Sequence, residues 1–414
     1  MKILIAGLSV RAMVESAVHS GYPVVALDAF GDQDLQSLAE SRSLHHDFGT
    51  RYNMRSLYKA SRLLDFDALA YTSNLENHPD TLQRIAGKRP IIGNPPETVR
   101  SVRCWETLSA GLRRAGFSIP DTIFPDEDRD ADTRRRWIVK PVKSGGGHGV
   151  KYLRVPASSD NDHILQEFLP GKPCSASFVA NGTECVLIGV TEQLVGVGLF
   201  GAKHFRYCGN VLPLSDCLAA RHSSSILEQL RELATFLTSR YGLRGVNGID
   251  FILNDDRVCL IEVNPRYSAS MELIEEAYML PVFHVHAQAV LHGRLPEFRL
   301  ESVLSPHQYL GKAILFASRN AVAPECKGWL DRAVRDIPAS GERLRTGNPI
   351  CTILANGTTY EDTIAGLSTQ AELLKEEIYG KADFDPRNRT LHQTRNRHLH
   401  GEGRDGLSRS SQRD

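Results

Sequence analysis

The sequence predicts a mixed α/β and α+β protein of more than one domain, and three observations carry this prediction. The chain has 414 residues, which is enough for two or three domains with buried cores. Short apolar strands alternate with helical stretches over residues 1–95, a pattern typical of an open parallel sheet. Between residues 137 and 266, strand patterns are instead joined by a glycine-rich loop and by a hairpin turn.

The N-terminal segment is predicted to contain four strands and a helix over residues 11–20. The strands are KILIA, PVVAL, FDALAYT and PIIG. Ligands of open parallel sheets bind beyond the carboxyl ends of the strands, where Gly7, Ser9, Arg11 and Asp28 lie. The stretch from Gly7 to Arg11 does not match GxGxxG, so a dinucleotide site is not favoured. The alternative that the N-terminus of the following helix binds a carboxylate or a phosphate is not excluded by this stretch.

The rest of the chain is predicted to hold further helices and strands. Helices are expected over residues 97–115, over residues 223–240 with one apolar stripe, and as a pair over residues 271–294. Strands are expected at ECVLIGVTEQ, KAILFAS and PICTILANG, and a closing helix at TQAELLKEEIYG. Residues 385–414 are polar and arginine-rich, with few apolar side chains, so we expect a disordered tail.

Composition excludes several classes of protein. Lysine plus arginine equals aspartate plus glutamate at 49 each, so no overall nucleic-acid footprint is expected. Apolar runs are short, which argues against a membrane span, and the N-terminus MKILIAGLSV is interpreted as a strand and not as a signal peptide. The eight cysteines form no CxxC pair. Reduced, packed thiols in a cytoplasmic protein are the expectation.

A hairpin over residues 248–266, GIDFILNDDRVCLIEVNPR, carries three oxygen-bearing side chains that we expect to lie close together. Glu262 and Asn264 are two residues apart on one strand and therefore share a face. If the strands pair about the predicted turn, Asp250 lies near them. Two carboxylates and an amide in one place favour a hard divalent cation. The alternative is an ordinary hairpin whose polar face meets water.

A glycine-rich loop follows an apolar strand in WIVKPVKSGGGHGV. A run of glycines lets backbone N–H groups approach a polyphosphate, and a lysine on the adjoining strand, Lys140, can reach the phosphates. The lysine precedes the glycines, so the pattern is not a P-loop. The alternative is a flexible turn between two strands. The loop positions are Ser144, Gly145, Gly146, Gly147 and Gly149.

A short strand end in LQEFLPG is the third candidate element. An adenine ring needs an apolar slot and backbone hydrogen bonds to its edge, and a linker strand of this kind supplies both. The alternative is a plain strand end before a Pro-Gly turn. The residues concerned are Gln166, Glu167, Phe168 and Leu169.

Taken in this order, the three elements resemble the ATP-grasp superfamily over residues ~95 to ~290. The hairpin is the most specific part, because IEVNPR with an upstream DFI closely matches the metal motif of that superfamily. The resemblance implies that ATP lies between two α+β subdomains and that residues 144–149 close over its phosphates, which Lys140 contacts. It implies that residues 166–169 hold the adenine. It also implies one or two Mg²⁺ (or Mn²⁺) ions on Asp250, Glu262 and Asn264, and it places Arg266 against the transferring phosphate.

The resemblance also divides the chain. Residues 1–95 match the α/β domain that usually precedes the ATP-grasp module. Residues 96–300 form the module, with the glycine loop in residues 120–170 and the metal site in residues 171–300. An α+β segment follows over residues 301–384.

One departure concerns a second lysine that often contacts the nucleotide in this superfamily. Here the stretch is SVRCWETL, so Arg103 or Arg100 is expected to replace that lysine.

The resemblance implies a reaction in which ATP converts a carboxylate to an acyl phosphate that an amine then attacks. The substrates are small molecules, and a homodimer is one expectation. For the substrates, a cluster formed by Lys203, His204 and Arg206 could face an anion, and a solvated basic loop is the equal alternative.

The N- and C-terminal stretches, GLSVRAMVESAVHSGYPVVALDAFGDQDL and GNPICTILANGTTYEDTIAGL, are similar to carboligase-like members, which include tyramine–glutamate ligases of methanofuran biosynthesis. Glutamate is therefore one expected carboxylate. The C-terminal stretch is also similar to biotin carboxylases. A bicarbonate-activating enzyme and a non-catalytic nucleotide-binding protein remain the alternatives.

Overall fold

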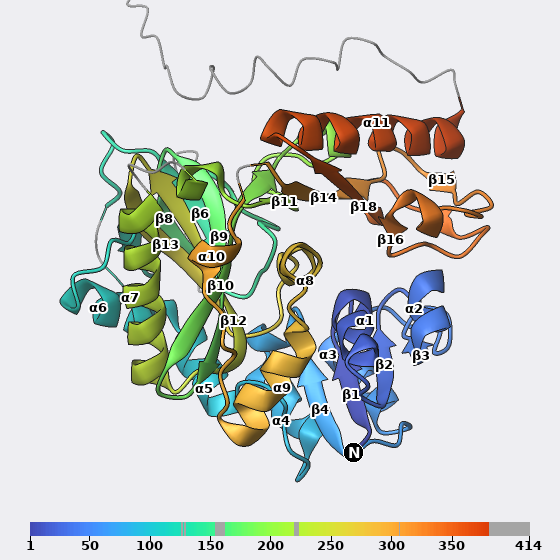
Figure 1. Ribbon diagram of the computed structural model, residues 1–414, viewed down its shortest axis with the longest axis horizontal. Helices are drawn as coiled ribbons and strands as arrows, with labels where there is room; N and C mark the ends of the chain where they lie inside the picture. Colours follow the sequence, from blue (N-terminus) through green and yellow to red (C-terminus); the bar gives the residue numbers. More distant parts are fainter. Residues whose placement is uncertain (126, 128–129, 154–161, 219–222, 306, 381–414) are drawn as a thin grey trace, which may run out of the picture.

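The computed structural model describes residues 1–125, 127, 130–153, 162–218, 223–305 and 307–380. Its strands form a parallel sheet, a large antiparallel sheet and two smaller sheets (Figure 1). This mixed α/β and α+β architecture confirms the predicted fold class. The tail predicted over residues 385–414 lies outside the described residues.

The N-terminal sheet is parallel, as the strand–helix alternation predicted. Its strand order is β3-β2-β1-β4, and Ile3 on the central strand pairs with Val24 on one side and Ala68 on the other. Three of its strands are buried along their whole length, because a hydrophobic core lies on each face of the sheet. The strands are β1 (Ile3–Ala6), β2 (Val24–Asp28), β3 (Glu40–Ser43) and β4 (Ala68–Tyr71).

The large sheet has eight strands in the order β13-β12-β9-β10-β11-β14-β18-β16, all pairing antiparallel. Strands from both sides of residue 300 take part in it, and the division of the chain near residues 95, 300 and 384 stays a prediction. Its strands are β9 (Lys172–Asn181), β10 (Cys185–Val195), β11 (Tyr207–Leu212), β12 (Arg244–Asn254), β13 (Arg257–Asn264), β14 (Tyr309–Phe316), β16 (Val334–Arg335) and β18 (Pro349–Gly357).

A third sheet holds the glycine-rich loop. Its order is β5-β8-β6-β7, again antiparallel, and the loop joins β6 to β7. The strands are β5 (Thr122–Ile123), β6 (Trp137–Pro141), β7 (Lys151–Tyr152) and β8 (His163–Glu167), while β15 (Ala321–Val322) and β17 (Arg343–Leu344) form a separate pair.

Helices cover the sheets, and two of them differ from the prediction. The single helix predicted over residues 97–115 is wrong, because Cys104 is extended and separates α5 from α6. The closing helix α11 begins nine residues earlier than predicted, since Thr359 caps it by accepting a hydrogen bond from the Asp362 backbone N–H at 3.0 Å. The helices are α1 (Arg11–His19), α2 (Gln33–Leu38), α3 (Met54–Ser61), α4 (Pro79–Ala86), α5 (Pro96–Arg103), α6 (Trp105–Arg114), α7 (Ser223–Tyr241), α8 (Met271–Tyr278), α9 (Val282–His292), α10 (Leu300–Val303) and α11 (Tyr360–Tyr379), with short 3₁₀ turns η1 (Leu75–Asn77), η2 (Gly198–Phe200), η3 (Ser215–Leu218) and η4 (Leu330–Arg332).

One hydrophobic core connects segments that are far apart in the sequence. Ile3 of β1, Phe283 of α9 and Leu310 of β14 are all buried within it. Burial of this shared apolar surface holds one face of the parallel sheet against α9 and the large sheet. The parallel sheet therefore packs beside the large sheet.

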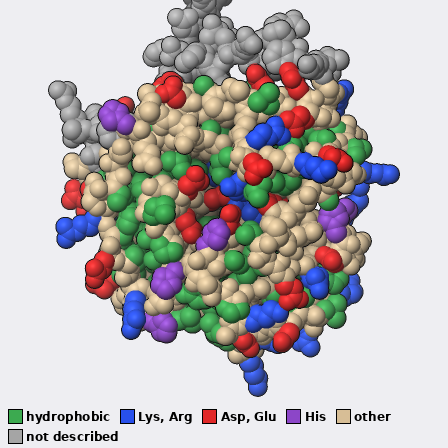
Figure 2. Space-filling view, turned by 45° about the vertical axis from the view of Figure 1, so that its right-hand side comes forward, with side chains coloured by type: hydrophobic (Ala, Val, Ile, Leu, Met, Phe, Trp, Pro, Cys, Tyr) green, Lys and Arg blue, Asp and Glu red, His purple; other side chains and the backbone are tan. Residues whose placement is uncertain are grey.

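The surface and the cysteines add three observations. Figure 2 shows acidic and basic side chains intermingled over the face that it draws. All eight cysteines are free thiols, and Cys104 alone among them is exposed. No helix in the described part of the chain is both long and apolar enough to span a bilayer.

Candidate functional site

The hairpin of β12 and β13 brings its three oxygen-bearing side chains together. Asp250 pairs with Glu262 across the two strands, and Gly248 pairs with Asn264. The Asn264 amide Nδ2 donates a hydrogen bond to Asp250 Oδ2 at 2.9 Å. Gln193 on β10 donates to Asp250 Oδ1, also at 2.9 Å. The two carboxylates therefore face the same side of the large sheet, and a residue from a third strand holds one of them.

Two cations lie against Glu262. Arg103, the last residue of α5, donates a hydrogen bond from Nη1 to Glu262 Oε1 at 2.6 Å. The Lys140 ammonium on β6 lies 3.7 Å from Glu262 Oε2 and donates to the Ile261 carbonyl at 3.1 Å. Arg100, the other arginine considered for this position, instead pairs with Asp80 at the surface. The structure thus brings Arg103, and not Arg100, to the acidic pair.

The two carboxylates differ in protonation because their surroundings differ. Burial and the neighbouring charge of Glu262 raise the pKa of Asp250 to about 6. Burial also opposes ionisation of Glu262, but Arg103 and Lys140 outweigh it and lower the pKa of Glu262 to about 2. At neutral pH both groups are therefore ionised, which is the state that a cation requires.

The available side chains suit a magnesium ion that also binds phosphate and water better than they suit a metal ion bound only by protein ligands. Among the described residues, no group of three or more histidine, cysteine, aspartate or glutamate side chains is placed to hold a metal ion. Asp250 and Glu262 supply two carboxylates and Asn264 an amide oxygen. Magnesium typically takes one or two carboxylates from a protein and completes its octahedron with phosphate oxygens and water. The site therefore suits a magnesium ion that arrives with a phosphate-bearing ligand.

Two residues of the turn η1, which follows β4, also contact this group of side chains, and the sequence reasoning missed both. Glu76 in η1 accepts a hydrogen bond from Arg266 Nε at 2.8 Å. Asn77, the next residue, accepts one from Arg103 Nη2 at 2.7 Å. Arg266 also donates from Nη2 to Asn264 Oδ1 at 3.2 Å. The turn η1 thereby holds both arginines beside the acidic pair.

A topological signal could have found these two residues. The strand order of the parallel sheet is β3-β2-β1-β4, so β2 and β3 lie on one side of β1 and β4 lies on the other. Ligands of open parallel sheets bind in the crevice where the strand order reverses in this way. η1 follows the carboxyl end of β4. Glu76 is 1% exposed and its Oε2 has no hydrogen-bond partner in the described part of the chain, which marks it as unusual for a structural carboxylate.

The glycine-rich loop lies against β11. The Tyr207 backbone N–H donates to the Gly146 carbonyl at 3.0 Å. Gly147 has φ of +69°, and a Cβ added there would stand 1.8 Å from the Phe205 carbonyl oxygen. Only glycine fits this close approach of two backbones. Added Cβ atoms at Gly145 would meet nothing within 4 Å.

The loop also contacts the residues around the acidic pair. The Ser144 carbonyl accepts hydrogen bonds from Arg103 Nη2 at 3.5 Å and from Asn77 Nδ2 at 3.4 Å. Gly149 has φ of +79°. The loop thus begins directly beside the arginine that holds Glu262.

The predicted adenine strand ends in an aromatic cluster. The Phe168 ring lies 5.3 Å from Tyr152 and 6.2 Å from Phe205, centroid to centroid, and the Arg136 guanidinium stands 4.5 Å above it. Gln166 is buried, and its Nε2 has no hydrogen-bond partner among the residues described. Glu167 accepts from the Asp121 backbone N–H at 3.3 Å, and Leu169 is half-buried.

The predicted substrate cluster does not meet the acidic pair. Lys203 and His204 are exposed. Arg206 donates to the Gly347 carbonyl at 2.6 Å, and its guanidinium lies 4.0 Å from the centre of the Phe316 ring. Arg206 therefore ties β11 to the C-terminal segment.

Known proteins are similar to this chain in sequence and in fold. Residues 105–270 match the family model of the ATP-grasp domain. The chain has an ATP-grasp fold. An uncharacterized protein of Methanocaldococcus jannaschii, MJ0776, is 23% identical over 86% of this chain and 88% of its own length.

Solved ATP-grasp-like neighbours cover nearly the whole chain. The biotin carboxylase domain of 2-oxoglutarate carboxylase from Hydrogenobacter thermophilus, a dimer in complex with MgADP, ADP and bicarbonate, has a TM-score of 0.66 at 13% identity and covers 91% of this chain and 90% of its own. An L-amino acid ligase from Bacillus licheniformis has a TM-score of 0.62 at 15% identity and covers 91% of this chain and 98% of its own. At these identities the likeness concerns the fold.

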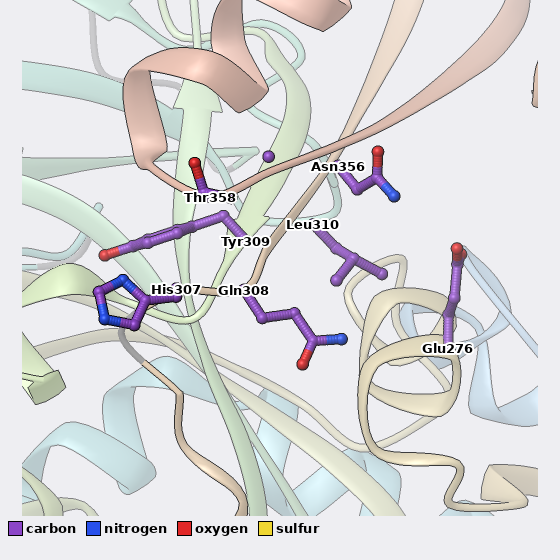
Figure 3. Close-up of a pocket in the computed structure, with 8 residues that line it drawn as sticks. Glu276, His307, Gln308, Tyr309, Leu310, Asn356 and Thr358 are labelled. Atoms are coloured by element: carbon purple, nitrogen blue, oxygen red, sulfur yellow. The ribbon is translucent and has the colours of Figure 1, made fainter.

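A separate pocket of about 420 Å³ lies on the same large sheet of the ATP-grasp fold (Figure 3). Glu276 of α8 lines one side of it, while Leu310 of β14 and Asn356 of β18 line another. None of the carboxylates of the hairpin lines this pocket. It is therefore distinct from the acidic pair.

Proposed function

We propose that this protein is an ATP-dependent ligase that joins a carboxylate to an amine through an acyl phosphate. The observation that supports this most directly is the pairing of Asp250 with Glu262 beside Arg103 and Lys140, in a chain with an ATP-grasp fold. Carboxylates that could bind a metal cation thus lie next to basic side chains that could bind phosphates. Phosphoryl transfer needs this combination, because its transition state carries charge on the phosphate oxygens.

In this proposal the chain binds ATP with magnesium or manganese. Asp250, Glu262 and Asn264 would hold the metal, which supplies positive charge against the phosphates. Residues 144–149 cover the phosphates and residues 166–169 hold the adenine. Arg103 and Lys140 release Glu262 when the nucleotide enters and turn to its phosphates, since Arg103 contacts the Ser144 carbonyl of the glycine loop and Lys140 lies on β6, which leads into that loop.

The proposed reaction has two steps, formation of the acyl phosphate and its attack by the amine. An oxygen of the substrate carboxylate attacks the γ-phosphorus, and the bond to the bridging oxygen of ADP breaks. The amine nitrogen then attacks the acyl carbon, phosphate leaves with the bonding electrons, and the nitrogen loses a proton. Arg266, held by Glu76 on one side and Asn264 on the other, steadies the transferring phosphoryl group. No nucleophile from the protein is needed.

The substrates are part of the proposal. Glutamate is the first carboxylate to test. We also propose a role in coenzyme biosynthesis of the methanofuran type, and a homodimer in the cytoplasm. A bicarbonate-activating enzyme is the second candidate. It is favoured by the likeness over 91% of this chain to a biotin carboxylase domain whose structure contains MgADP and bicarbonate.

The test is ADP release with Mg²⁺ and ATP, screening carboxylates, glutamate first, and bicarbonate against a panel of amines that includes tyramine. Release that needs both a carboxylate and an amine would support the ligase. Release with bicarbonate and no amine would support the second candidate. ATP binding without release under any condition would contradict both and favour a nucleotide-binding protein.

Matched variants show whether the release comes from this site. Asp250→Ala and Glu262→Ala are expected to abolish it. Asp255→Asn alters an exposed aspartate in the turn of the same hairpin and is expected to leave release unchanged. Asn tolerates the positive φ of 51° at this position, so the turn itself is kept.

A further inference from the structure

A second charged cluster, separate from the acidic pair, surrounds Arg11 at the start of α1. The Arg11 side chain is 1% exposed and forms ion pairs with Glu15 at 2.8 Å, Asp336 at 3.1 Å and Asp34 at 3.6 Å. It also pairs with Glu272 of α8, which in turn pairs with Lys312 of β14. The cluster thus lies where the N-terminal sheet, α8 and the C-terminal strands meet.

The carboxylates of this cluster outnumber its cations. Arg11 and Lys312 are the cations that form its ion pairs among the described residues. Burial and mutual repulsion raise the pKa of Asp28 to about 7 and the pKa of Asp32 well above its usual range, so added positive charge would stabilise the ionised carboxylates. The carboxylates are Glu15, Asp28, Asp32, Asp34, Glu272 and Asp336.

Two of the aspartates accept hydrogen bonds from backbone groups, although Asp28 Oδ2 has no partner among the described residues. Asp34 accepts from the backbone N–H groups of Asp336 at 2.9 Å and Ile337 at 3.0 Å, so it docks the C-terminal segment onto the N-terminal domain. Asp28, at the carboxyl end of β2, accepts from Phe30 at 3.1 Å and Gly31 at 3.0 Å through one of its oxygens. These two carboxylates therefore have structural roles.

Asp32 has no such role. Asp32 is 7% exposed, its Oδ2 is buried without a hydrogen-bond partner among the described residues, and its side chain does not cap α2, which it precedes. Burial, together with the charges of Asp336 and Asp28, raises the pKa of Asp32 well above its usual range, so Asp32 belongs electrostatically to the cluster. An unpaired polar atom that is buried this deeply costs free energy, and native structures rarely retain one without a partner.

The surroundings of Asp32 favour a ligand. Asp336 has φ of 53°, a left-handed conformation that a non-glycine residue adopts rarely, and functional sites often hold such residues. The pocket of Figure 3 begins beside the α8 and β14 side of the cluster, because Glu276 lies one helical turn beyond Glu272 and Leu310 is two residues from Lys312 on the same strand. Glu276 also forms no ion pair with a residue of the described chain.

We propose that the Asp32 cluster binds a cationic group of the amine substrate, so that this amine carries an ammonium or guanidinium group besides its reacting nitrogen. This inference rests on the proposed ligase function. The missing partner of Asp32 is a hydrogen-bond donor with positive charge, which an alkylammonium supplies. A metal ion fits less well, since no group of acidic side chains in the described ranges has metal-binding geometry.

The test is direct binding of putrescine, by calorimetry at neutral pH and constant ionic strength, without ATP or a carboxylate. Wild type is expected to bind putrescine, and Asp32→Asn to weaken binding by about ten- to hundredfold, the range typical of a lost charge-assisted hydrogen bond. Asn has nearly the same size and removes a buried carboxylate, so the fold is expected to persist, and circular dichroism checks this. Asp32→Glu keeps the charge and is expected to bind more tightly than Asp32→Asn.

The matched control is Asp65→Asn, which removes one exposed carboxylate from the same domain and is expected to bind putrescine as wild type does. Equal affinity of wild type and Asp32→Asn, or no binding by either, would overturn the proposal, and so would Asp32-dependent binding of Mg²⁺ alone. Because ATP is absent, this result is independent of ADP release. Loss of ligase activity with intact putrescine binding would count against the proposed function and not against the cation site.

Discussion

Arg103 and Glu262 lie 2.6 Å apart, Nη1 to Oε1, although 159 residues separate them in the sequence. This contact joins the end of α5 to the hairpin of β12 and β13. Both side chains are mostly buried, at 14% and 20% exposed, so the pair is shielded from solvent. Its position beside the glycine loop makes Arg103 the first residue to test.

Replacing Arg103 by lysine is expected to lower kcat/KM for ATP by roughly ten- to a hundredfold. Lysine keeps the charge but cannot contact Glu262 and Asn77 at once as the guanidinium does. Steady-state kinetics at saturating magnesium measure the effect. Arg100→Lys is the matched control on the same helix, because Arg100 is exposed and pairs with Asp80. Similar kinetics for the two variants would contradict the assignment of Arg103.

Glu76→Gln is expected to reduce kcat by roughly tenfold or more while the protein stays folded. The substitution keeps the shape but weakens the ion pair that aims Arg266, which is 2.8 Å away. The rate of ADP release at saturating substrate checks this expectation. Glu97→Gln, at an exposed position in the first turn of α5, serves as control. An unchanged kcat in Glu76→Gln would mean that Arg266 does not depend on this contact.

Gly147→Ala is expected to detach the glycine loop from β11. The added Cβ would overlap the Phe205 carbonyl oxygen, and φ of +69° is strained for alanine. Hydrogen exchange at the Tyr207 amide, which donates to Gly146, should accelerate by about tenfold or more. Gly145→Ala adds the same methyl group in open space, so exchange there should match wild type. Equal protection in both variants would show that the loop does not rest on β11.

His286 is expected to make the protein less stable in mild acid. Its Nδ1 accepts from the Val246 backbone N–H at 2.8 Å and its Nε2 lies 2.9 Å from the Ile92 carbonyl, so the neutral ring satisfies both neighbours. Burial lowers the pKa of His286 to about 4. The unfolded chain therefore binds a proton before the folded chain does, and stability falls as the pH drops from 6.5 towards 4.

The size of this effect is about 3 kcal/mol of unfolding free energy over that interval. Chemical denaturation at a series of pH values measures it. His286→Gln can keep both hydrogen bonds but does not titrate, so its decline should be smaller by that amount. His284→Gln, on the exposed side of the same helix, should decline as wild type does. If all three proteins decline equally, His286 is not the titrating group.

Local pattern alone predicted much of the fold and part of the candidate site. The two-residue period of a strand placed Glu262 and Asn264 on one face, and the Asn254–Asp256 turn brought Asp250 opposite Glu262. Strand–helix alternation predicted the parallel sheet. These features depend on neighbours within about twenty residues, which is the range over which periodicity and turn chemistry act.

The sequence by itself thus determined the class of the fold and the acidic hairpin, while the tertiary structure decided which distant residues meet there. The choice of Arg103 over Arg100, the arrival of Glu76 and Asn77, and the departure of Arg206 towards Gly347 all follow from how helices and sheets pack. So does the meeting of Arg11 with Asp336, 325 residues apart. Such contacts carry no local signal, because burial of shared apolar surface, and not spacing along the chain, brings them together.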